Sequence, residues 1–231
     1  MNNFNSVIPA LDFSWYDSPN INILDLSSNK FHGQIPESIC NVTSLEILDL
    51  SNNSLNGTIP QCFFSTSINL RVLNLRRNNL IGKISDTFPS NCSLQTLNVN
   101  KNLLEGMLPK SLANCINLEV LAIGNNQIHD VFPCYLKGIL NLRALVLQLN
   151  KFYGSIGCGW PNVTWPMLQI VDLASNNFSG KLSIKAMATS KAMMVDDEAQ
   201  SKLNFLHSEN RGMHYGYYQD VITVTSKNRE I

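Results

Sequence analysis

The feature that most constrains this chain is an asparagine that recurs about every 24 residues at the same place in an apolar pattern. Leu48 and Leu50, for example, precede Asn53 by five and three positions. Apolar residues two apart predict a short strand with one buried face. A repeat of this period predicts a solenoid, in which successive turns stack and bury one continuous core. The intervals are 27, 24, 25, 24, 24, 24 and 26 residues, between Asn2, Asn29, Asn53, Asn78, Asn102, Asn126, Asn150 and Asn176.

The other positions of the repeat also have physical reasons. The asparagine amide both accepts and donates hydrogen bonds, so it can satisfy backbone groups where the chain bends out of the strand. Glycine follows four residues later in most turns, where a tight bend favours positive φ, with Ser6 and Asp130 as departures. An apolar residue and proline come next, as in Ile35-Pro36, at the far side of the coil. We therefore predict a structural ladder made of Asn29, Asn53, Asn78, Asn102, Asn126, Asn150 and Asn176.

The segments LDLSSNKFHGQIPESIC and LDLSNNSLNGTIPQCF resemble the plant-specific class of leucine-rich repeat over residues 1–183. This resemblance implies an α/β solenoid, a right-handed superhelix that is mostly strand and loop, with a concave parallel β-sheet. The stretch from VLNLRRNNLIGKIS to LVLQLNKFYG is similar to the membrane-proximal half of plant receptor-like proteins of the disease-resistance and wilt-resistance kind. That family implies a single-pass receptor without a kinase, which relies on receptor kinases as co-receptors.

The repeat register breaks after the last ladder asparagine. Residues 1–183 are expected to form about eight turns, the first one partial. Residues 184–216 contain no Leu-x-Leu line and are predicted to be a non-repeat island, with a disordered end as the alternative. Residues 217–231 are interpreted as the end of the island, leading to a truncated next repeat, because VITVT alternates like a strand. By resemblance the island contacts ligand or co-receptor, with Tyr215, Tyr217 and Tyr218 as candidates.

Composition excludes several classes of protein. The 17 basic and 17 acidic residues balance, which gives no support to nucleic-acid binding. The four histidines are scattered and no catalytic or metal-ligand motif appears, so we expect no enzyme, no metal and no cofactor. The sequence has no signal peptide and no apolar stretch that would span a membrane. We therefore expect a fragment or truncated product, whose full-length parent lies at the extracellular side of the plasma membrane and reaches the membrane only through segments absent here.

Ligand binding is predicted on the concave sheet, where side chains between the buried leucines point outward. A basic and amide-rich patch there suits an acidic peptide or a carbohydrate, although an ordinary solvated face is the alternative. Its residues are Arg71, Arg76, Arg77, Asn98, Asn100 and Lys101. A smoother strip is expected farther along, framed by Tyr153 and Trp160, which are residue types typical of binding hot spots. The strip consists of Ala122, Gly124, Val146 and Leu149.

Cysteines and glycosylation motifs add further candidates. Cys134 and Cys158 each lie eight residues after a ladder asparagine in successive turns, so their Cα atoms can come within disulfide range. A Cys40–Cys62 bridge stays open, whereas Cys115 and, similarly, Cys92 are favoured as small buried hydrophobes. Asn-x-Ser/Thr motifs mark candidate N-glycosylation sites at Asn41, Asn52, Asn56, Asn91, Asn162 and Asn177.

Three functional hypotheses remain. The first is the ligand-sensing ectodomain of a receptor-like protein in plant defence, which binds an extracellular peptide, protein or glycan. The second is a secreted inhibitor of a microbial cell-wall hydrolase, and the segment YYQDVITVTSK argues against it because such inhibitors normally have no island. The third is a non-functional truncated product.

Overall fold

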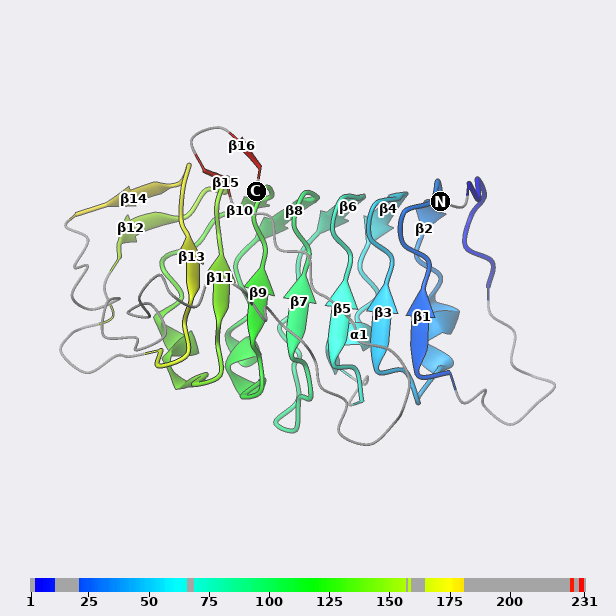
Figure 1. Cartoon of the computed structure of the whole chain (residues 1–231), viewed down its shortest axis with the longest axis horizontal. Helices are drawn as coiled ribbons and strands as arrows, with labels where there is room; N and C mark the ends of the chain where they lie inside the picture. Colours follow the sequence, from blue (N-terminus) through cyan, green and yellow to red (C-terminus); the bar gives the residue numbers. More distant parts are fainter. Residues whose placement is uncertain are drawn as a thin grey trace, which may run out of the picture.

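The computed structural model describes residues 3–10, 21–65, 69–156, 158, 165–180, 225–226 and 229–230. Over these residues the chain coils into turns that stack along one long axis (Figure 1). We call each turn from residue 21 onward a rung and number the rungs by their ladder asparagine, from rung 1 at Asn29 to rung 7 at Asn176. Residues 1–183 were expected to be repeats, and the rungs described end at residue 180.

Every rung contributes one strand to a seven-stranded parallel sheet. The strands pair in one register, so that Leu48 lies opposite Leu73 and Leu73 opposite Leu97. This register follows from the repeat, because a slip by one residue would turn every leucine to the other face. The strands are β1 (Ile23–Asp25), β3 (Ile47–Asp49), β5 (Val72–Asn74), β7 (Thr96–Asn98), β9 (Val120–Ala122), β11 (Ala144–Val146) and β13 (Ile170–Asp172).

A second set of strands follows the ladder asparagines. Five of them form a parallel sheet, namely β2 (His32–Gln34), β4 (Ser54–Thr58), β6 (Asn79–Gly82), β8 (Leu103–Gly106) and β10 (Gln127–Ile128). Two more, β12 (Tyr153–Ser155) and β14 (Asn177–Ser179), form a parallel pair. Within residues 217–231, β15 (Thr225–Ser226) and β16 (Arg229–Glu230) pair in antiparallel fashion.

Short helices form the remaining side of four rungs. They are η1 (Glu37–Asn41), α1 (Cys62–Ser65), η2 (Lys110–Asn114) and η3 (Cys134–Gly138). Rung 3 has no helix between β6 and β7. Within the described ranges, none of the helices has the length and hydropathy that a membrane crossing requires.

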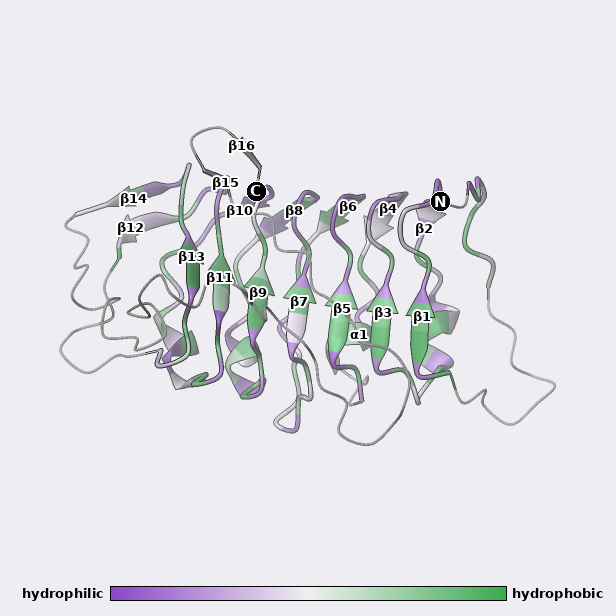
Figure 2. Ribbon diagram, viewed as in Figure 1, coloured by the Kyte–Doolittle hydropathy of each residue, from purple (hydrophilic) through white to green (hydrophobic). Residues whose placement is uncertain are grey.

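The core lies between the two sets of strands and the helices. Leu48, Leu73 and Leu97 are completely buried there, as are the leucines two positions later at Leu50 and Leu75. Figure 2 shows the same arrangement, with hydrophobic strands and hydrophilic segments at many strand ends. A leucine-rich solenoid of strand and loop was the prediction from the sequence, and the structure confirms it.

The ladder asparagines join neighbouring rungs. The Oδ1 atom of Asn102 accepts a hydrogen bond from Leu80 N of the preceding rung at 3.0 Å. Its Nδ2 donates to Leu75 O at 3.0 Å and to Val99 O at 3.1 Å, one carbonyl in each rung. The same two inter-rung bonds recur at Asn53, Asn78, Asn126, Asn150 and Asn176.

All six cysteines form disulfides between adjacent rungs. Cys134 is bonded to Cys158, with their Cα atoms 5.2 Å apart, and Cys40 is bonded to Cys62. Cys92 and Cys115 were expected to be unpaired core residues, and this expectation is wrong: they are bonded, with Cα atoms 4.8 Å apart. Both are buried in the core as well, so burial and bonding coexist there.

Candidate ligand-binding face

The candidate site lies on the front face, by which we mean the face of the seven-stranded sheet that points away from the leucine core. Alternation along a strand places Val72 and Asn74 of β5 on this face, because Leu73 and Leu75 point into the core. The middle row of the front face changes character along the solenoid, from acidic through amide to apolar, and it is acidic again in the last rung. In rung order it consists of Asp25, Asp49, Asn74, Asn98, Ala122, Val146 and Asp172.

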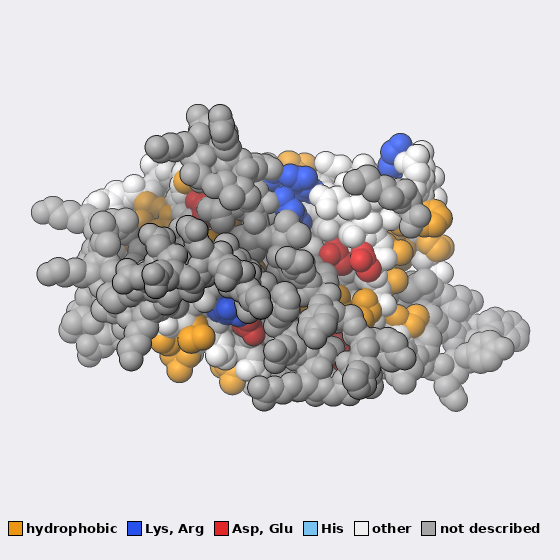
Figure 3. Space-filling view, viewed as in Figure 1, with side chains coloured by type: hydrophobic (Ala, Val, Ile, Leu, Met, Phe, Trp, Pro, Cys, Tyr) orange, Lys and Arg blue, Asp and Glu red, His pale blue; other side chains and the backbone are white. Residues whose placement is uncertain are grey.

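Three cations meet where β5 and β7 end. Arg76 is buried, Lys101 is half-buried and Arg77 is exposed. Arg77 and Lys101 occupy equivalent positions in successive rungs, both with left-handed backbone at φ 55° and 57°. Figure 3 shows Lys and Arg side chains gathered on this side of the molecule, near the upper end of β7.

Two of these three cations have a lowered pKa. Burial lowers the pKa of Arg76, and the charge of Arg77 lowers it further. The pKa of Lys101 is also lowered, first by burial and then by the charges of Arg77 and Arg76. Like charges held close together disfavour the charged form, whereas an anion among them favours it. The cluster is therefore chemically suited to a carboxylate or another anion.

Two amides adjoin the cations. Asn98 is buried, and its Oδ1 accepts a hydrogen bond from Asn100 N at 3.2 Å. Asn100 is buried too, and its own Oδ1 has no hydrogen-bond partner among the described residues. A buried acceptor without a donor is costly, so Asn100 is an unfavourable polar group behind the cations rather than a contact that a ligand can reach.

Arg71 does not belong to this cluster, although the sequence analysis grouped it there. Its Nη1 lies 3.6 Å from Glu46 Oε2, at the opposite end of β5 from Arg76. Five residues of extended chain correspond to about 16 Å. Arg143 and Glu119 form an equivalent pair at 3.5 Å three rungs farther on. Arg71 is thus part of a polar edge where the strands begin.

The predicted apolar strip is present in part. Ala122 and Val146 are buried and pack with Val120 and Ala144 into a cluster separate from the main core. Gly124 is buried, and Leu149 is 42% exposed with φ 52°. A side chain at Gly124 would approach Gln148 Cγ to 2.9 Å, so the closeness of the neighbouring rung favours glycine there.

Tyr153 does not frame that strip, which corrects the expectation. It lies in β12, in the second set of strands, and stacks on His129 with ring centroids 4.6 Å apart. Trp160 and the candidates Tyr215, Tyr217 and Tyr218 lie outside the described residues, as do Asn162 and residues 184–216.

The remaining glycosylation candidates differ in exposure. Asn52 is half-buried at φ 53°, and its Nδ2 donates to Ser28 Oγ at 3.5 Å. The others are exposed, namely Asn41, Asn56, Asn91 and Asn177. The part of the chain that the structure describes contains no group of three or more His, Cys, Asp or Glu side chains placed to hold a metal ion.

Stacked rungs, a ladder of asparagines and a parallel sheet with variable side chains define a leucine-rich-repeat solenoid. The sequence matches the Leucine Rich Repeat family over residues 20–42, 44–66, 69–91 and 93–115. It is 38% identical over 72 residues to Receptor-like protein 31 of Arabidopsis thaliana, which is 31% of this chain and 8% of that protein.

Solved structures of plant receptors have a similar fold. The plant peptide hormone receptor RGFR1, in complex with RGF2, has a TM-score of 0.66 and 28% identity, over 78% of this chain and 32% of that one. The Arabidopsis receptor kinase HAESA, in complex with the peptide hormone IDA and the co-receptor SERK1, has a TM-score of 0.60 and 32% identity, over 67% of this chain and 25% of that one. The chain is thus similar to part of plant leucine-rich-repeat receptors and spans less than a third of these relatives. Its fold is a protein-interaction scaffold.

Proposed function

We propose that this chain is part of the ligand-recognition ectodomain of a receptor-like protein, and that the front face binds an extracellular peptide or protein with an acidic group. The relatives support ligand recognition, because RGFR1 and HAESA are in complex with peptide hormones. Binding is the activity, and no catalysis is assigned to the chain.

The observation that carries this proposal is the cluster of Arg76, Arg77 and Lys101. The charge of Arg77 lowers the pKa of Arg76 and of Lys101, and an anion bound between these side chains would stabilise their charged forms. Arg77 is exposed and can reach a ligand. A ligand with a carboxylate matches this feature.

The cellular context is part of the same proposal. The parent acts in defence signalling at the plasma membrane and has no kinase of its own. It uses receptor kinases as co-receptors, and the complex of HAESA with the co-receptor SERK1 supports this last part. Three disulfides favour an oxidising, extracellular setting. Glycans are proposed at the exposed motifs Asn41, Asn56, Asn91 and Asn177. A glycan ligand is a second option, to be tested beside peptides.

The test measures binding of a panel of synthetic peptides to the purified chain by calorimetry. Each peptide is prepared with Asp or Glu and with the neutral Asn or Gln in the same position. Acidic peptides should bind more tightly than their neutral counterparts, and the preference should disappear in Arg77→Glu and in Arg76→Glu/Arg77→Glu. The control Lys30→Glu changes an exposed cation away from the cluster and should retain the preference.

Two results would refute the role of the cluster. One is an acidic preference that survives reversal of both arginine charges in a folded protein. The other is equal binding of acidic and neutral peptides. Inhibition of a purified microbial cell-wall hydrolase by the unmodified chain would instead support the secreted-inhibitor alternative.

A further inference from the structure

Rung 3 departs from the repeat on the outer side of the coil. Rungs 1, 2, 4 and 5 carry a proline before a short helix, whereas rung 3 has Ser85 at that position and no helix. Its segment is held to rung 4 instead. Asp86 Oδ1 accepts a hydrogen bond from Ser111 N at 2.7 Å, and Phe88 N donates to Ser111 Oγ at 3.1 Å. Where rung 3 lacks a helix, residues 86–88 are therefore hydrogen-bonded to Ser111 of rung 4.

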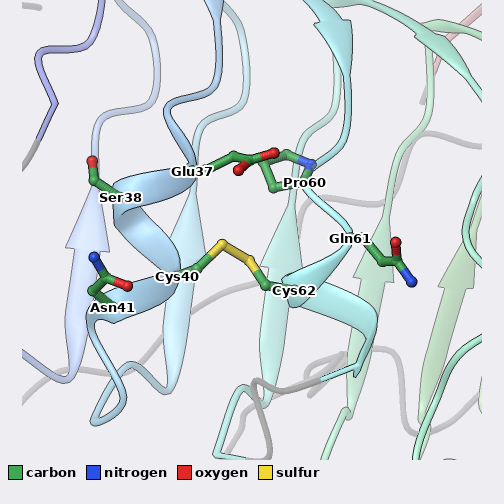
Figure 4. Close-up of a pocket in the computed structure, with 7 residues that line it drawn as sticks. All are labelled: Glu37, Ser38, Cys40, Asn41, Pro60, Gln61 and Cys62. Carbon is green, nitrogen blue, oxygen red and sulfur yellow. A yellow bond between two sulfur atoms is a disulfide. The ribbon is translucent and has the colours of Figure 1, made fainter.

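A groove lies along this part of the molecule. It has a volume of about 860 Å³ and extends from Glu37 of rung 1 to Lys110 of rung 4. A second pocket of about 550 Å³ adjoins it and shares Glu37, Pro60 and Gln61. Figure 4 shows the second pocket, with the Glu37 side chain reaching toward Pro60 and Gln61 pointing away from Glu37. We call the whole feature the lateral groove.

One end of the lateral groove is cationic. Lys83 is exposed and forms no ion pair with a described residue, and its Cγ atom lies 2.9 Å from the point where a Cβ atom on Gly106 would stand. Asp86 is the nearby acid, and its carboxylate accepts a hydrogen bond from Ser111 N of rung 4. Hydrogen bonds from Ser111 lower the pKa of Asp86 most, and the charge of Lys110 lowers it further. Lys83 is therefore an exposed cation that a ligand can reach, and Lys110 is a second one in the next rung.

The floor at this end is apolar. Met107 is 60% exposed, next to Leu108, which is 2% exposed, and Ile84, which is 4% exposed. Methionine is unbranched and flexible, so it adapts to apolar groups of different shape. The opposite end carries the exposed carboxylate of Glu37. The groove thus presents an acid in rung 1, a polar middle in rung 2, the cation Lys83 in rung 3 and the apolar Met107 in rung 4.

The length of the groove indicates the size of its occupant. Rungs 1 and 4 are separated by three spacings of about 4.8 Å, or about 14 Å in total. An extended peptide rises about 3.3 Å per residue, so about four to five residues span this distance.

We propose that the lateral groove binds an extended peptide segment of a partner protein, about four to five residues long, with an acidic side chain at Lys83 and an apolar side chain on Met107. A basic residue at the other end of the segment meets Glu37. The charge pattern of the groove selects both the sequence and the direction of the bound segment.

The experiment uses the purified chain and an array of synthetic six-residue peptides that combine Leu or Met with Glu, Gln or Lys at one end. Binding is measured by fluorescence anisotropy, and the site is mapped by hydrogen exchange. Peptides with Glu should bind about tenfold more tightly than those with Gln, with protection at residues 83–86 and 106–110. Met107→Glu should abolish binding and Lys83→Gln should remove the preference for Glu.

Matched controls are available on the same protein. Met167→Glu alters a methionine that is 46% exposed in a distant rung, and Lys30→Gln removes an exposed cation outside the groove. Both should bind the peptides normally, and so should Arg77→Glu, which separates this site from the front face. The proposal is overturned if no peptide binds or if the protected amides lie outside the groove. It is also overturned if only a carboxylated oligosaccharide, such as oligogalacturonate, protects the amides of the groove.

Discussion

Replacement of Asn102 by alanine tests the ladder at its centre. The change removes the acceptor for Leu80 N and the donor to Leu75 O and Val99 O. The two carbonyls each keep another partner, because Asn78 Nδ2 also donates to Leu75 O and Asn126 Nδ2 to Val99 O. Leu80 N is the group left without its partner.

The magnitude follows from these contacts. An unsatisfied buried N–H costs about 1–3 kcal/mol, and each lost hydrogen bond to a carbonyl that keeps a partner about 0.5–1 kcal/mol. We therefore expect Asn102→Ala to lower the free energy of unfolding by about 2–5 kcal/mol. The control Asn117→Ala changes an exposed asparagine in the same rung and should alter it by less than about 0.5 kcal/mol.

The assay is urea unfolding followed by circular dichroism, together with hydrogen exchange at Leu80 N. Exchange matters because stacked repeats can lose structure locally before the whole chain unfolds. Asn102→Asp extends the test, since it keeps the acceptor but points a carboxylate at two carbonyls. It should be more stable in acid, where the protonated carboxyl can donate, than at neutral pH. Equal stability of Asn102→Ala and Asn117→Ala would refute the reasoning.

Three other perturbations test the fold. Gly106 has φ +83°, so Gly106→Ala should lower the free energy of unfolding, measured in urea, by about 1–2 kcal/mol. In the control Gly138→Ala, the added Cβ meets nothing within 4 Å, so this change should be neutral or slightly stabilising. Joint replacement of Cys92 and Cys115 by serine opens a loop of sequence separation 23 and should cost about 3 kcal/mol; an unchanged melting temperature would contradict this. The lowered pKa of Asp86 contributes stability above the unfolded pKa of about 3.9 that is lost as pH falls through the folded pKa. Asp86→Asn should therefore weaken the pH dependence of the urea midpoint below about pH 4. An identical pH profile would argue against a stabilising role of the hydrogen bonds between Asp86 and Ser111.

Periodic features of this protein were predictable and local departures were not. The ladder and the leucine core could be predicted from the spacing of residues alone. Every rung buries its leucines at the same positions and places its asparagine at the same bend. The same reasoning suggested Cys134 with Cys158, which lie at equal offsets from their ladder asparagines. It missed Cys92 with Cys115, whose offsets differ, since rung 3 lacks the helix that rung 4 has.

The candidate site shows a similar division. Arg76, Arg77 and Lys101 were correctly placed near one another because they follow equivalent strands. The position of Arg71 was predicted wrongly. Arg71 and Arg76 are close in sequence, but they lie at opposite ends of the extended strand β5. Left-handed backbone at the residue before each ladder asparagine was also missed, because residues as different as Leu149 and Arg77 occupy that position and carry no common signal.

The disulfides join rung 1 to rung 2, rung 3 to rung 4 and rung 5 to rung 6, and each junction between these pairs has none. Under a stretching force applied at the chain ends, a loop closed by sulfur cannot lengthen until its bridge is reduced. The segments 41–61, 93–114 and 135–157 would therefore contribute no extension, while the residues between them would. A solenoid stretched from its ends would therefore lengthen in a few short steps, and its three disulfide-closed segments would stay intact.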